Sequence, residues 1–200
     1  MRVFRFLSAL GAMTLLLASA ISQEKSEPDP DRMQAILVGV LNRVNHQNDQ
    51  WFEIGDYPRC IQSLRVLHEI YPTDYDVASS LGWLLESTDQ DAEALAVYVR
   101  FRLENPADPE APFPEANYYF MKRAYALVPP LLEPVIHMAL KPHPNTFRRL
   151  AHAYERLGLL ADSKRVWEQL IKLTPEDEAA KANLQRVLRK IKGELDPPKR

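Results

Sequence analysis

The chain has 200 residues, which is enough for one domain or a short array of repeats. Its 27 acidic and 25 basic residues leave a net charge of −2, and this balance disfavours a general nucleic-acid-binding protein. The only cysteine, Cys60, excludes a disulfide framework within one chain. Sixteen prolines, together with the lack of alternating strand patterns, predict an all-α protein with many helix ends.

Residues 1–20 have the features of a secretory signal peptide. Arg2 and Arg5 precede an uncharged run of 16 residues, 6–21, which is short for a membrane-spanning helix. The sequence Ala-Ser-Ala at 18–20 is a small-x-small cleavage site. We predict cleavage after Ala20 and an exported protein, periplasmic or secreted, whose 23 basic and 27 acidic residues give a net charge of −4. An uncleaved N-terminal anchor is the alternative.

A polar, proline-containing segment, 21–31, is predicted to be a flexible linker to a helical domain at 32–193. Apolar residues then recur at the spacing of a first helix: Met33, Ile36, Leu37, Val40, Leu41 and Val44. This helix is expected to fray or kink over the polar stretch 45–50, before Trp51 and Phe52.

The spacing of prolines indicates an internal repeat. Pro72 and Pro106 are 34 residues apart, whereas Pro106 and Pro175 are 69 apart, so a further unit is expected between 107 and 143. The predicted units cover 41–74, 75–108, a degenerate 109–143, and 144–177. Of the first unit only the second half fits well, so its beginning is also consistent with an N-terminal cap.

The two clear units each predict a pair of amphipathic helices, because large and small residues recur on one face of each segment. In 75–108 these residues are Leu81, Gly82, Leu85, Ala94, Tyr98 and Phe101. In 144–177 they are Phe147, Leu150, Ala151, Tyr154, Ser163, Trp167 and Leu170, with a turn at Gly158. Gly82 stands where the two helices should approach most closely, so a side chain there is expected to clash.

In the degenerate unit and at the chain's end, the residues that start or stop helices predict where the elements lie. A helix is expected over 116–127, and the prolines at 129, 130 and 134 then predict a short second helix that starts at Pro134 and ends at Leu140. A closing helix at 176–192 is expected to follow an N-cap at Thr174. Its inward residues would be Ala180, Leu184, Val187, Leu188 and Ile191, its solvent-facing residues Lys181, Arg186, Arg189 and Lys190. A disordered tail, 194–200, would end the chain.

These marked positions resemble the tetratricopeptide repeat, a 34-residue helix-turn-helix unit. The resemblance implies a right-handed α-solenoid with a C-terminal capping helix, a non-catalytic scaffold that binds a protein or peptide in its concave groove, and no cofactor. It also implies which first-helix positions face the groove. In 75–108 they are Asp76, Ser79, Trp83, Glu86 and Ser87, and in 144–177 they are Asn145, Arg148, His152, Glu155 and Arg156.

Two of these groups suggest specific contacts. Trp83 is expected to be exposed, as a binding hot spot would be, and the alternative is that it packs on the degenerate unit. Arg148, Arg149, Arg156 and His152 form a positive patch that could receive a carboxylate. The acids at the neighbouring groove positions, Asp76 and Glu86, argue against a dedicated carboxylate clamp and favour solvated charges for most of this patch.

No catalytic or metal-binding constellation is predicted. The five histidines show no metal-binding pattern, Cys60 occupies an apolar position, and phosphate-binding and nucleophile-elbow sequences are missing. Two alternatives remain open at this stage. One is an accessory or catalytic module built on 107–143, with Glu115, Tyr118, Tyr119 and His137 as its polar residues. The other is a membrane-anchored envelope assembly factor. The oligomeric state is not predicted.

Overall fold

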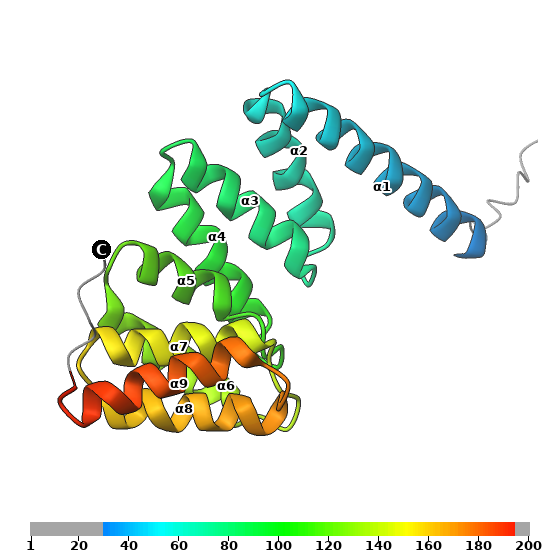
Figure 1. Ribbon diagram of the computed structural model, residues 1–200. Helices are drawn as coiled ribbons and strands as arrows, with labels where there is room; N and C mark the ends of the chain where they lie inside the picture. Colours follow the sequence, from blue (N-terminus) through cyan, green and yellow to red (C-terminus); the bar gives the residue numbers. More distant parts are fainter. Residues whose placement is uncertain (1–29, 195–200) are drawn as a thin grey trace, which may run out of the picture. The chain divides into compact units, whose positions relative to one another are not determined.

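The computed structural model describes residues 30–194, and all regular secondary structure in that range is helical (Figure 1). The elements are α1 (Pro30–Glu53), α2 (Tyr57–Ile70), α3 (Tyr75–Ser87), α4 (Asp91–Glu104), α5 (Phe113–Met121), the 3-10 helix η1 (Tyr125–Leu127), α6 (Val128–Ile136), α7 (Pro144–Arg156), α8 (Leu160–Leu173) and α9 (Glu178–Ile191). Between residues 30 and 194, no helix combines the length and the apolar character that crossing a membrane requires. The predicted signal peptide, residues 21–29 of the linker and residues 195–200 of the tail lie outside the described residues.

The described residues divide into two units, 30–47 and 48–194. Helix α1 is continuous over 24 residues, so the predicted kink at 45–50 is wrong, and the helix begins at Pro30, inside the predicted linker. Polar residues change which face of a helix meets water, but without Gly or Pro they do not end it. Six of its apolar side chains are more than 40% exposed: Met33, Ile36, Leu37, Val38, Val40 and Phe52.

Four turns share one backbone feature that defines the repeat. Gly55, Asp89, Arg123 and Gly158 have φ angles of 75°, 60°, 61° and 76°, and they lie 34, 34 and 35 residues apart. Each lies in the left-handed region that ends a helix and lets the next one begin. The sequence predicted this turn at the two glycines only. The turn therefore recurs four times at the period of the repeat, and in the degenerate unit it lies at Arg123.

Replacing Arg123 with glycine is expected to raise the free energy of unfolding by about 0.5–1 kcal/mol, because glycine adopts this φ without the steric penalty of a Cβ atom. Arg123 is exposed, so little packing is lost. Urea denaturation monitored by circular dichroism measures the change. The matched variant, Gly158→Ala, should lower the same free energy by about 1 kcal/mol. A destabilised Arg123→Gly protein would contradict this account of the turn.

The degenerate unit differs from its prediction in both helices. Helix α5 spans Phe113–Met121 instead of 116–127, and α6 starts six residues before Pro134 and ends at Ile136 instead of Leu140. Pro129 and Pro130 fit the first turn of α6, where backbone N–H groups have no helical acceptor. Pro134 costs roughly 3 kcal/mol inside the helix. Burial of Val128, Leu132, Val135 and Ile136 offsets this cost, at about 1.5–3 kcal/mol each.

Helices α6 to α9 enclose the main core. The predicted residues Phe147, Leu150, Ala151, Trp167 and Leu170 are all at most 1% exposed. The N-cap of α9 is Asp177, whose carboxylate accepts from the Ala180 backbone N–H, so the predicted start at 176 and cap at Thr174 are wrong. The Thr174 hydroxyl instead donates to the Leu170 carbonyl at the end of α8.

The closing helix also differs in which residues it buries. Ala180 and Val187 are fully buried, as predicted, but Ile191 is 47% exposed. Arg186, predicted to face solvent, is half-buried and binds Glu155 of α7. The reason is that a buried carboxylate on α7 needs cationic partners, and α9 is the helix within reach.

Candidate functional site

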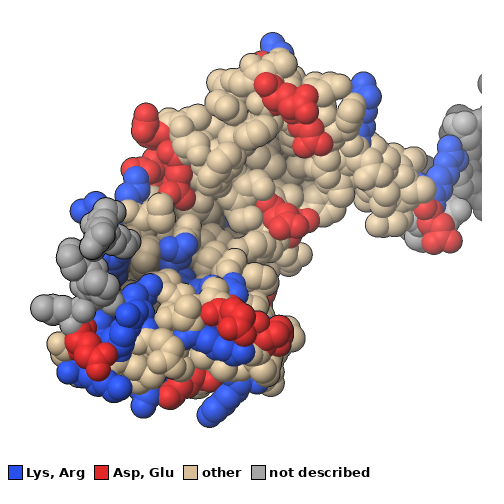
Figure 2. Space-filling model, viewed as in Figure 1, with Lys and Arg blue, Asp and Glu red and all other residues tan. Residues whose placement is uncertain are grey.

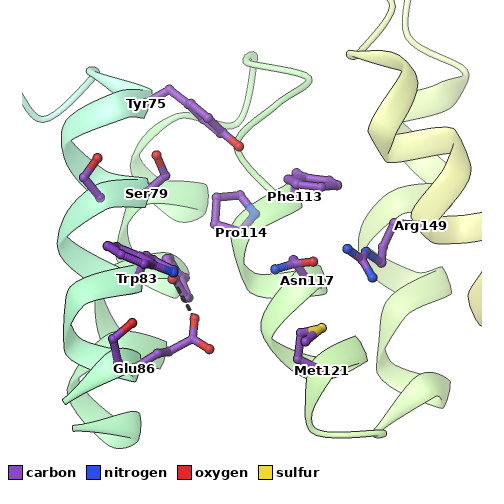
Figure 3. Close-up of a pocket in the computed structure, with 12 residues that line it drawn as sticks. Tyr75, Ser79, Trp83, Glu86, Phe113, Pro114, Asn117, Met121 and Arg149 are labelled. Atoms are coloured by element: carbon purple, nitrogen blue, oxygen red, sulfur yellow. Dashed lines mark hydrogen bonds between the residues drawn. The ribbon is translucent and has the colours of Figure 1, made fainter. Parts of the chain in front are cut away.

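A groove of about 760 Å³ lies between α3 and α5, with Tyr98 of α4 and Arg149 of α7 also reaching it (Figure 3). Helix α3 contributes Tyr75, Ser79, Ser80, Trp83, Glu86 and Ser87, and α5 contributes Phe113, Pro114, Asn117 and Met121. Four of the lining residues were predicted from the sequence: Ser79, Trp83, Glu86 and Ser87. Asp76, also predicted, is exposed on the first turn of α3 and does not line the groove.

Trp83 is 53% exposed, which confirms the prediction that it is accessible. Its ring lies 6.0 Å from that of Phe52, and Phe52 lies 5.7 Å from Tyr57. These three aromatic side chains, all more than a third exposed, form an open surface beside the groove. The alternative, that the degenerate unit buries Trp83, is therefore wrong.

Glu86 is held in place at the groove by Tyr98. The Tyr98 hydroxyl donates to a Glu86 carboxylate oxygen at 2.7 Å (dashed line, Figure 3). Burial, and then the bond to Glu86, raises the pKa of Tyr98 far above its usual range, so the hydroxyl keeps its proton and remains a donor. The carboxylate of Glu86 is thus presented to the groove in a defined position.

The positive face predicted on α7 is largely neutralised by the chain itself. Arg148 donates to Asp177 and to Asn145. Arg186 and Lys190 of α9 each bind Glu155 at 2.8 Å, and His152 lies 3.4 Å from the same carboxylate. Burial opposes ionisation of Glu155, but the hydrogen bonds from His152, Arg186 and Lys190 outweigh it and hold its pKa well below the usual range.

The remaining predicted residues lie apart from the groove. Asn145 lines a smaller cavity of about 400 Å³, together with Tyr75, Glu110, Phe113 and His143. Arg156 is exposed at the end of α7. The structure therefore brings four of the five predicted residues of α3 together at the groove, but none of the five predicted residues of α7.

Comparison with solved structures shows which fold this is. MamA, a TPR-like protein, is similar with a TM-score of 0.59 at 16% sequence identity, over 74% of this chain and 85% of MamA. MamA from Desulfovibrio magneticus RS-1, residues 41 to the end, gives 0.59 at 17%, over 76% and 85%. The first TPR of Spaghetti (RPAP3), bound to the HSP90 peptide SRMEEVD, gives 0.51 at 19%, over 58% and 94%. The chain has a tetratricopeptide-repeat fold. No protein-family model and no curated protein matches its sequence.

Within this repeat fold, the α5 residues of the groove occupy the same positions as those of α3. Counted from residue 109, so that Arg123 is position 15, Phe113, Asn117 and Met121 are positions 5, 9 and 13. Those are the positions of Ser79, Trp83 and Ser87 in the preceding repeat. The sequence reasoning missed them because its helix in this repeat began three residues late. Counting 34 residues from Asp89 would have found them.

Arg149 is a further residue that was missed as a groove residue. It is half-buried, its guanidinium carbon lies 4.4 Å above the Phe120 ring centroid, and burial lowers its pKa. Figure 3 shows its side chain extending from α7 toward Asn117 of α5. The sequence placed Arg149 in the positive patch but outside the groove positions.

The residues of the catalytic alternative do not converge. Glu115 is buried and accepts from Arg102 at 2.6 Å, whereas His137 pairs with Glu133 at 3.1 Å. The Tyr118 and Tyr119 rings contact each other edge-on, and none of these four predicted residues lines the groove. The Glu133–His137 pair at i, i+4 was overlooked in the sequence. Among residues 30–194, however, no three metal-binding side chains come together.

The single cysteine, Cys60, is buried in the protein core. Cys60 is 1% exposed, and its thiol donates to the Asn48 backbone carbonyl at 3.4 Å. Burial, followed by the charge of Asp56, raises the pKa of this thiol. A thiol that resists ionisation is a poor nucleophile, so its environment is that of a core residue, as predicted.

Charged side chains are unevenly distributed over the repeats. Figure 2 shows acidic and basic groups gathered over the C-terminal helices, while the surface over α2 and α3 is mostly uncharged. The groove between α3 and α5 follows this pattern, since its described lining carries two charged side chains, Glu86 and Arg149. Its remaining surface is aromatic, apolar or neutral polar.

Proposed function

We propose that this protein is an exported, non-catalytic scaffold that holds a segment of a protein partner in the groove between α3 and α5. The observation that carries this proposal is Trp83, a large aromatic side chain that is 53% exposed on the groove wall. Tryptophan is enriched among the few residues that dominate the binding energy of protein interfaces. Met121, on the facing helix, is 64% exposed and offers an adaptable apolar contact.

A structural neighbour supports the class of partner. The first TPR of Spaghetti (RPAP3) was solved with a bound HSP90 peptide. The groove described above combines aromatic, apolar and polar groups, as protein-binding surfaces do. A peptide or protein segment therefore fits its chemistry better than a nucleic acid, whose phosphates need a basic surface.

Replacing Trp83 with alanine is expected to weaken partner capture by roughly tenfold or more, the effect of losing one interface hot spot. The thermal midpoint should change little, because the side chain is largely in water. The measurement is quantitative affinity capture from extracts of the source cells, with the protein starting at Ile21 as bait and mass spectrometry as readout.

Asp76→Ala is the matched control, because Asp76 is exposed on the same helix and does not line the groove. It should retain the same proteins as the parent. Capture that is unchanged in Trp83→Ala, or lost equally in Asp76→Ala, would rule out this groove as the binding surface.

Export is the second part of the proposal, and it rests on the basic start, the apolar run and the Ala-Ser-Ala sequence within residues 1–21. Sequencing the N-terminus of the protein made in its source cells tests it. An N-terminus at Ile21 in the exported fraction is the expected result. A retained N-terminus in the membrane fraction would instead support the membrane-anchored assembly factor.

A further inference from the structure

Arg149 differs from the other partly buried arginines of its repeats. Arg102 is paired with Glu115, Arg148 with Asp177, and Arg186 with Glu155. Arg149 is half-buried, yet among the described residues it has neither a hydrogen-bond acceptor nor a carboxylate partner; its neighbour is the Phe120 ring. Placing a guanidinium away from water without an anion is unfavourable, so a protein tends to pair such a group.

The surroundings of Arg149 contain an open place for an anion. Arg149 and Asn117 both line the groove, and Figure 3 shows the guanidinium directed toward the Asn117 amide. The side-chain oxygen of Asn117 is buried and lacks a hydrogen-bond partner within the described chain. The one carboxylate of the described groove lining, Glu86, is already engaged with the Tyr98 hydroxyl. The Arg149 guanidinium is therefore left to donate to an acceptor that enters the groove, whereas the Asn117 oxygen is left to accept from a donor, such as a backbone N–H of the same segment.

We propose that the groove binds a partner segment that places an aspartate or glutamate side chain on Arg149 and an apolar or aromatic side chain against Trp83. This inference rests on the proposed function and specifies its ligand. A guanidinium binds one carboxylate through two parallel hydrogen bonds, which are strong when water is partly excluded.

The source of the carboxylate is a side chain within the segment. Arg148 and His152, the other cations of the predicted patch, are engaged by Asp177 and Glu155 and do not line the groove. One guanidinium suits one carboxylate, and the aromatic and apolar lining beyond it accommodates residues on the segment around that acid.

A peptide library displayed at the N-terminus of a phage coat protein is the probe, because its peptides have no free C-terminal carboxylate. Selection on the protein starting at Ile21 should enrich peptides that share an acidic residue near an apolar or aromatic one. Selection on Arg149→Gln should lose the acidic residue from the enriched sequences. Arg156→Gln removes an exposed arginine from the same helix, outside the groove, and should enrich the same peptides as the parent.

An enriched peptide, synthesised with a C-terminal amide, then allows a double-mutant cycle by calorimetry. Arg149→Gln and the peptide's acid-to-amide change should each weaken binding about tenfold or more, and together no further than either alone. Arg149→Lys should bind with intermediate affinity, since it keeps the charge but loses the paired donors. Melting curves confirm that each variant is folded.

The outcomes separate the two proposals. If the parent enriches no peptide, both the proposed function and this inference are wrong. If peptides are enriched but the acidic preference survives Arg149→Gln, or the two changes add independently, the groove binds peptides and the role of Arg149 is overturned. If peptides with a free C-terminus bind better than their amides, the proposal that a side chain supplies the carboxylate is likewise overturned.

Discussion

Trp167→Ala is expected to lower the free energy of unfolding by about 3–5 kcal/mol, the range for truncating a fully buried aromatic side chain. The indole is fully buried in the core that also contains Phe147, Leu150 and Leu170. Truncation leaves a cavity between three packed helices, which cannot close without moving their backbones. Urea denaturation followed by circular dichroism at 222 nm measures the loss.

A second substitution at the same position separates packing from polarity. The Trp167 indole N–H is buried without a hydrogen-bond partner in the described chain. Trp167→Phe keeps a ring and removes this unsatisfied donor, so it should cost much less than alanine. Leu173→Ala on the same helix, at a residue that is 48% exposed, is the control and should change stability little. A Trp167→Ala protein that unfolds at the parental urea concentration would show that this core is not the one described.

Gly82→Leu is expected to cost about 3 kcal/mol, at the upper end of the range for overpacking. A Cβ atom at residue 82 would lie 2.0 Å from the Cε1 atom of Tyr98, far inside contact distance. The ring cannot easily move aside, because it is 4% exposed and its hydroxyl is bound to Glu86. Helices α3 and α4 would have to separate, and the stability loss follows from the contacts that this breaks. Thermal and urea denaturation are the measurements.

Two controls make this result specific. Gly39→Ala lies on the continuous helix α1 with no atom near a new Cβ, and should be stabilising by about 1 kcal/mol through helix propensity. Adding Tyr98→Ala to Gly82→Leu should recover part of the loss, because the two changes share one contact. Full additivity of the two changes would contradict the proposed clash. Because Trp83 follows Gly82, the leucine should also weaken partner binding.

The sequence predicted the regular repeats well because their signals are local. A helix pair buries one face of each helix, and the spacing of Leu81, Gly82 and Leu85, or of Leu150 and Ala151, reports that face directly. The burial of Trp167 and Cys60 and the exposure of Trp83 followed from the same register. Each of these depends on contacts between neighbouring segments of the chain.

The degenerate repeat was predicted poorly because its signals compete. Three prolines argued against a helix over 128–136, yet the buried apolar residues there stabilise one. Arg123 adopts a backbone conformation that favours glycine, so nothing in its residue type indicated the turn. In both places the energy gained by packing against neighbouring repeats exceeded a local preference, and local preference is all that a pattern of residues expresses.

By itself, the sequence determined that this protein is all-helical, that its unit is about 34 residues long, and which side chains pack between paired helices. The tertiary structure alone decided which polar groups remain available to a partner. Asp177 lies 29 residues along the chain from Arg148, and Glu155 lies 31 residues from Arg186, so only folding brings each acid to its cation. Arg149 is left without such a partner for the same reason: the pairing of charges depends on distances in space, which residue spacing does not contain.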